Sequence, residues 1–132
     1  MYDVIFIVIT HWVADFLFQK EEWALGKSSS AFLLLKHVIT YIFIWVLAIL
    51  AYRPDVVWSN LTYGVSVFVF CVLNFGAHII TDHFTSMWTK RLFEQKKYYT
   101  SLPNMGAFSI IGLDQLLHYV ALFLSWDFIF GI

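Results

Sequence analysis

The chain is poor in charge, cysteine and proline. Only 13% of its 132 residues are charged, whereas an ordinary soluble domain has about 25%. The net charge of −1 supplies no basic surface, so we expect no nucleic-acid partner. The single cysteine, Cys71, excludes both an internal disulfide and a thiolate zinc cluster. The two prolines, Pro54 and Pro103, lie in polar connections, where they are predicted to end or break helices.

The chain is instead rich in apolar side chains. Hydrophobic residues make up 61% of the chain and aromatic residues 20%, which indicates an integral membrane protein. A membrane-spanning helix needs about 20 residues, and the apolar runs have about this length, so they predict an all-α fold. We expect a four-helix bundle that forms a single transmembrane domain over residues 1–132. The helices are expected at about residues 4–23, 31–52, 61–88 and 108–130.

Lysine and arginine predict the orientation of these helices. The first connection contains Lys20 and Lys27. The third connection holds a larger basic cluster, namely Lys90, Arg91, Lys96 and Lys97. The positive-inside rule therefore predicts that both basic connections are cytoplasmic and that both termini lie outside, in a bacterial inner membrane.

The two halves of the chain share a polar pattern. His11 and Asp15 are four residues apart, as are His78 and Asp82. In each half a basic connection follows, and then a helix with a histidine near its start. These features are compatible with two similar helical hairpins in a parallel repeat, and also with chance similarity in a biased sequence.

Polar residues recur one helical turn apart inside the apolar segments. Residues four apart lie on one helix face, and polar groups in an apolar environment cost several kcal/mol unless they find partners. At a rise of about 1.5 Å per residue, the ionisable groups of all four helices fall roughly 7–16 Å from the cytoplasmic end. We therefore expect one polar layer in the inner leaflet, containing His11, Asp15, Gln19, His37, Asn74, His78, Asp82, Asp114, Gln115 and His118.

Imidazole and carboxylate together favour a divalent metal site. They are ligands of zinc, which we expect first, and of manganese or iron as alternatives. Helical bundles build metal sites in their cores from such pairs. The first predicted ligands are His11, His78, Asp82 and His118. Asp15 or Asp114 is expected to be a catalytic base or a partner of the ligands. The additional candidates are His37, His83, Gln19, Asn74 and Gln115.

These motifs resemble a family of small bacterial and phage membrane proteins of unknown function, DUF3307. The resemblance lies in His11-Trp-Val-Ala-Asp15-Phe-Leu-Phe-Gln19, the His37 segment, His78-x3-Asp82-His83 and Asp114-Gln115-x2-His118, and it would cover nearly the whole chain. The pattern is also distantly similar, in residue type only, to membrane-embedded metal-dependent hydrolases. It lacks the serine that several of those families place beside the metal.

Three functions are compatible with such a layer. The leading hypothesis is a metal-dependent hydrolase acting on a lipid or a small amphipathic substrate. The alternative is an ion or proton-coupled transporter or channel that uses the layer as a relay, and it would require a homo-oligomer because four helices are few. The third is a structural or adaptor protein in which the layer only specifies helix packing. The lipid bilayer is a partner in all three.

Overall fold

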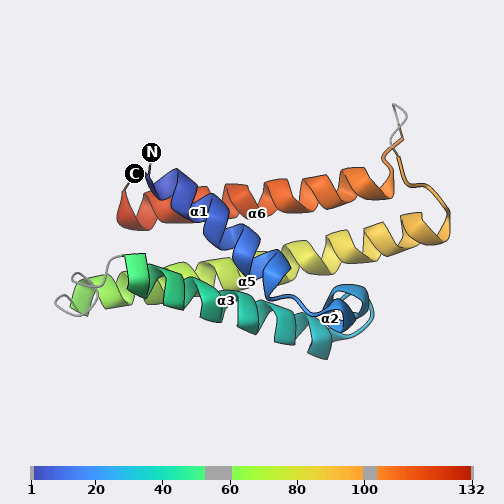
Figure 1. Cartoon of the computed structure of the whole chain (residues 1–132). Helices are drawn as coiled ribbons and strands as arrows, with labels where there is room; N and C mark the ends of the chain where they lie inside the picture. Colours follow the sequence, from blue (N-terminus) through green and yellow to red (C-terminus); the bar gives the residue numbers. More distant parts are fainter. Residues whose placement is uncertain (1, 53–60, 100–103, 132) are drawn as a thin grey trace.

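The computed structural model describes residues 2–52, 61–99 and 104–131, and its regular elements are all helices (Figure 1). In chain order they are α1 (Tyr2–Trp12), the π-helical turn η1 (Val13–Leu17), α2 (Glu21–Gly26), α3 (Ala31–Tyr52), α5 (Leu61–Glu94) and α6 (Ala107–Phe130). The all-α prediction is confirmed in these ranges. The predicted breaks at Pro54 and Pro103 lie outside the described residues.

The first predicted helix, 4–23, is not continuous. Helix α1 passes at Val13 into η1, where the amide of Phe18 donates to the Val13 carbonyl across 3.3 Å. The chain then leaves the helix until α2 begins at Glu21. The wider π turn changes the direction in which the following side chains point. A sequence pattern with the 3.6-residue period of an α-helix cannot predict this change. Helix α5 also reaches Glu94 instead of residue 88.

Three of the helices are long and apolar enough to cross a membrane. They are α3, residues Thr62–Glu94 of α5, and α6. Their outward faces carry large apolar side chains such as Phe68, Leu124 and Phe128, as expected of a surface in contact with lipid. These helices are consistent with an integral membrane protein, whereas α1 and η1 together are shorter than a full span.

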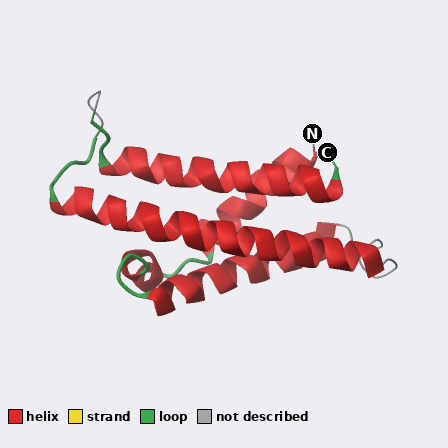
Figure 2. Cartoon of the chain, turned by 180° about the vertical axis from the view of Figure 1, so that it is seen from behind, coloured by secondary structure: helices red, strands yellow, loops and turns green. Residues whose placement is uncertain are grey.

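The long helices pack side by side, and α1 crosses them obliquely. Helix α5 lies along both α6 and α3, while α1 contacts α3 and α6 (Figure 1). The view from behind shows α5 and α6 running together over most of their length (Figure 2). The two chain ends lie at one end of the molecule, and α2 lies toward the other.

An aromatic core fills the half of the molecule near the chain ends. We use this name for Trp45, Phe70 and Trp126, with the buried side chains around them (Ile7, Ile49, Val67, Cys71 and Leu122). The Phe70 ring lies 5.3 Å from the Trp45 ring and 5.5 Å from the Trp126 ring, centroid to centroid. Close aromatic packing of this kind holds three helices together.

Candidate metal centre

Histidines and aspartates from every long helix, and from the α1–η1 segment, meet beside the aromatic core. We call the following residues the His/Asp cluster, and all of them are buried: His11 of α1, Asp15 of η1, His37 of α3, His78 and Asp82 of α5, and His118 of α6. The π turn brings Asp15 into this group, facing α3 and α5. Six of the ten residues expected in the polar layer therefore form one set of neighbouring side chains.

Two imidazole nitrogens at the middle of the cluster each lie close to two carboxylate oxygens. The Nε2 atoms of His37 and His78 are 3.0 Å apart. Asp15 Oδ1 lies 3.1 Å from His37 Nε2 and 3.5 Å from His78 Nε2. Asp82 Oδ2 lies 3.3 Å and 3.4 Å from the same two nitrogens. We call these residues, Asp15, His37, His78 and Asp82, the four-donor set.

These spacings fit a divalent cation. Zinc bonds of about 2.0–2.1 Å in a tetrahedron separate neighbouring donor atoms by about 3.3 Å. The nitrogen–oxygen distances of 3.1–3.5 Å bracket that value, and the nitrogen–nitrogen distance of 3.0 Å is slightly shorter. Among the described residues, Asp15 Oδ1 and Asp82 Oδ2 accept no well-directed hydrogen bond. Buried carboxylate oxygens normally have partners, so a positive ion between these groups would satisfy both.

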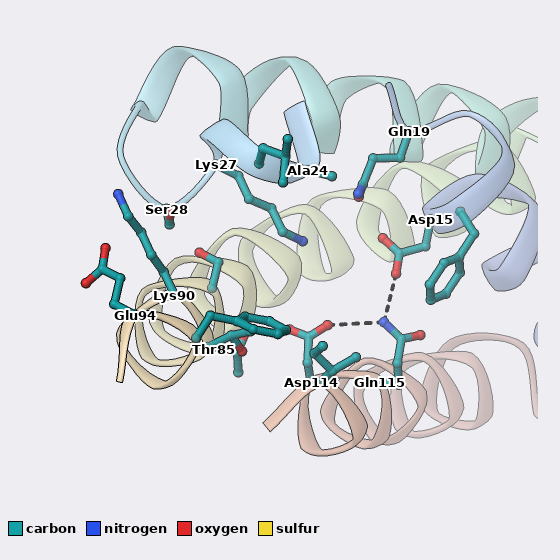
Figure 3. A pocket seen from close by; sticks show the side chains of 16 residues that line it. Asp15, Gln19, Ala24, Lys27, Ser28, Thr85, Lys90, Glu94, Asp114 and Gln115 are labelled. Carbon is teal, nitrogen blue, oxygen red and sulfur yellow. Dashed lines mark hydrogen bonds between the residues drawn. The ribbon is translucent and has the colours of Figure 1, made fainter. Parts of the chain in front are cut away.

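Neighbouring side chains hold the cluster in place. Gln115 Nε2 donates to Asp15 Oδ2 at 2.9 Å and to Asp114 Oδ2 at 3.1 Å (Figure 3). The Thr85 hydroxyl also bonds Asp114. His11 is fixed from both sides, with Nδ1 at 3.1 Å from the Tyr41 hydroxyl and Nε2 at 3.0 Å from Gln115 Oε1. Partners of this kind orient the residues that bind a metal.

A lysine from the first connection enters the cluster. Lys27, directly after α2, places Nζ 2.9 Å from Asp82 Oδ1. Burial disfavours the ammonium ion, but the carboxylate of Asp82 outweighs that effect and raises the pKa of Lys27. Lys27 therefore neutralises one oxygen of Asp82 while the other faces His37 and His78.

A pocket of about 700 Å³ opens beside the cluster, between η1, α2, α5 and α6. Asp15, Lys27, Asp114 and Gln115 line it next to the cluster, and Lys90 and Glu94 line the opposite side (Figure 3). Its apolar wall includes Phe16, Leu25, Phe93 and Ile111. Ligand-binding sites typically combine such a volume and apolar wall with a few converging polar groups.

The predicted residues divide into three groups. His11, His78, Asp82 and His118 lie in the cluster together with Asp15 and His37. Asp114, Gln115 and Gln19 line the pocket. Asn74 and His83 are elsewhere: the Asn74 amide donates to the Phe70 carbonyl and to Ser125, tying α5 to α6, and the His83 ring is exposed.

Sequence reasoning missed Lys27, Tyr41 and Thr85. Lys27 was assigned only to the orientation of the helices, although a buried aspartate requires a cation and the nearest lysines lay in that connection. Tyr41 is one helical turn after His37, a spacing that could have pointed to the same face. Thr85 gave no comparable signal, because threonine is common in apolar helices.

The fold and the cluster together define an all-helical, membrane-type protein with a buried His/Asp centre able to hold a metal. The chain belongs to the DUF3307 family, described as proteins of unknown function, and the match covers residues 4–132. The resemblance found in the motifs is thus confirmed. Searches of curated proteins and of solved structures gave no significant match.

Proposed function

We propose that this protein binds a divalent metal in the His/Asp cluster and uses it to hydrolyse a lipid or a small amphipathic substrate. The observation that carries the proposal is the four-donor set. The Nε2 atoms of His37 and His78 are 3.0 Å apart, each lies within 3.5 Å of a carboxylate oxygen of Asp15 and of Asp82, and those oxygens lack well-directed hydrogen bonds from the described residues. Zinc, manganese and iron suit this donor chemistry, with zinc the first candidate.

The pocket supports an amphipathic substrate. Asp15 belongs both to the four-donor set and to the pocket, so a bound molecule would touch the centre directly. The apolar wall formed by Phe16, Leu25 and Phe93 suits an acyl or other apolar chain, while Lys27 and Gln115 suit a polar head.

Asp114 is the residue we assign to proton transfer. A bound divalent metal lowers the pKa of water and polarises the group to be cleaved. Asp114 lines the pocket. Among the described residues it belongs to none of the groups whose ligand atoms lie close enough together to bind one metal ion, so it is available as a general base. It would take a proton from the attacking water, whose oxygen bonds the scissile centre, and return that proton to the leaving group. Gln115 and Thr85 would hold its carboxylate in position.

The aromatic core argues against a conduit through one chain. A transporter or channel would need a polar path from the cluster to the end that carries the termini. Trp45, Phe70 and Trp126 occupy that route and are at most 1% exposed. A relay would therefore require an axis between several copies of the chain. A structural role does not explain buried carboxylate oxygens that accept no well-directed hydrogen bond from the described residues.

The proposal includes the orientation of the chain in the membrane. We place the first and third connections in the cytoplasm, which would open the pocket toward the inner leaflet. A single cysteine at Ser29, in a Cys71→Ser background, should resist an impermeant maleimide on intact cells and react after permeabilisation. Labelling of the cysteine at position 29 on intact cells would show that the orientation is the opposite one, and it would leave the proposed metal site unaffected.

Hydrolysis in vesicles tests the function. Purified protein would be reconstituted with ester-linked and phosphodiester lipids carrying fluorogenic groups. We expect turnover that a chelator abolishes and added Zn²⁺ or Mn²⁺ restores. Asp114→Asn should lower it by about 10²–10⁴-fold while metal content is unchanged. His83→Ala is the matched control. Proton flux into dye-loaded vesicles that is lost in Asp82→Asn, without any hydrolysis, would establish the relay instead.

A further inference from the structure

The two oxygens of Asp15 face different partners. Oδ1 faces the ring nitrogens of His37 and His78, at 3.1 and 3.5 Å. Oδ2 accepts from Gln115 and lies 3.9 Å from His11 Nε2. The carboxylate therefore stands between two groups of histidines, one on α3 and α5 and the other on α1 and α6.

His118 is the least satisfied side chain of the second group. It is 3% exposed, yet neither ring nitrogen has a hydrogen-bond partner among the described residues. Its ring stacks on His78, with centroids 4.0 Å apart and planes within 4°. The nearest carboxylate oxygens, on Asp114 and Asp82, lie 3.7 and 3.9 Å away. A buried imidazole without a partner calls for another group at this position.

His11 can supply the matching nitrogen. One donor atom from each of His11, Asp15 and His118 lies within 4.8 Å of the others. The Tyr41 hydroxyl, 3.1 Å from His11 Nδ1, can accept a hydrogen bond from Nδ1–H, which keeps the proton on Nδ1 and leaves Nε2 with a free lone pair. Gln115 Oε1 lies 3.0 Å from His11 Nε2 and could be an oxygen ligand of a metal ion at the same place.

From this geometry we infer a second divalent-cation position, formed by His11, His118 and Oδ2 of Asp15, so that Asp15 bridges two metal ions. The inference rests on the proposed function, because the four-donor set holds the first ion. The second position offers imidazole nitrogens and carboxylate or amide oxygens, a donor set suited to Zn²⁺, Mn²⁺ or Fe²⁺. Paired metals of this kind can stabilise both the attacking and the leaving oxygen of a displacement.

Manganese loading of the purified full-length protein tests the bridge. Equilibrium dialysis with Mn²⁺ should give two ions per chain. The electron paramagnetic resonance spectrum should show the exchange coupling of two nearby Mn²⁺ ions. His118→Ala should retain one ion with an uncoupled six-line signal, and His83→Ala, the exposed control, should retain two coupled ions.

The possible failures are distinct. One uncoupled ion per wild-type chain, with no loss in His118→Ala, would overturn the bridge and leave the proposed function standing. No bound Mn²⁺ and no bound Zn²⁺ in folded wild type would overturn both. Because the wild-type spectrum alone reports coupling, the test stays decisive if His118→Ala does not fold.

Discussion

The two halves of the molecule are stabilised in different ways. Around Trp45 and Trp126 the helices meet through buried apolar side chains in close contact. A few turns away, around Asp82, they meet through imidazoles, carboxylates and one lysine. The first kind of contact is non-directional and tolerates changes that preserve volume. The second is directional, and each member depends on the others.

The contrast indicates where the function lies. A helical membrane protein could pack throughout as it does in the aromatic core, without burying any charge. Instead three buried carboxylates lie beside four buried histidines, an arrangement that costs free energy unless a ligand or an ion completes it. Variants of the two halves should therefore separate stability from metal binding.

Asp82→Asn should have the largest effect. It replaces the charged carboxylate of the four-donor set by a neutral amide and strands the ammonium of Lys27, which lies 2.9 Å from Asp82. Removing one partner of a buried charged pair costs about 3–5 kcal/mol. We expect loss of both stability and bound metal, measured by thermal unfolding in detergent and by elemental analysis. Asp127→Asn, at an exposed position, is the control. Equal, small effects of the two variants would contradict the interdependence of the cluster.

Trp45→Ala should lower stability and spare the metal. The side chain is 0% exposed, and a large-to-small change of this kind costs about 3–5 kcal/mol. The protein that remains folded should bind metal as the wild type does. Phe68→Ala, on the exposed face of α5, should change stability by less than about 0.5 kcal/mol. Loss of metal from folded Trp45→Ala protein would mean that the two halves are not separable.

Tyr41→Phe should have a smaller and selective effect. It removes the hydroxyl beside His11 Nδ1 and leaves the ring in place. Loss of such an orienting partner typically weakens metal affinity by about 10–100-fold. Calorimetric titration with Mn²⁺ should show weakening of one binding event only. An unchanged isotherm would remove Tyr41 from the centre.

His83→Ala should have the smallest effect. Although His83 directly follows Asp82, its ring points away from the cluster and is exposed. Exposed substitutions usually change stability by less than about 0.5 kcal/mol, and we expect unchanged metal content and turnover. A loss of metal comparable to that of Asp82→Asn would show that His83 belongs to the site.

Hydropathy and one-turn spacing predicted much of this arrangement. Helix α3 has the predicted bounds 31–52, because a long apolar run leaves little choice of structure. The meeting of His11, His78, Asp82 and His118 followed from equal depth on packed helices. The π turn at Val13–Leu17 was not predictable, since it depends on contacts made by neighbouring helices. For the same reason the contacts of His37 with Asp15 and Asp82, and the entry of Lys27 into the cluster, could not be predicted.

X-ray absorption at the metal edge, on protein purified without added metal, tests the central claim most directly. The His/Asp cluster predicts a shell of nitrogen and oxygen ligands at about 2.0–2.2 Å, with the outer-shell scattering of imidazole. The contribution of the ion held by the four-donor set should be lost in a His37→Ala, His78→Ala double variant that still folds. Folded wild-type protein that contains no metal and takes none up, or a metal signal unchanged in the double variant, would contradict the account.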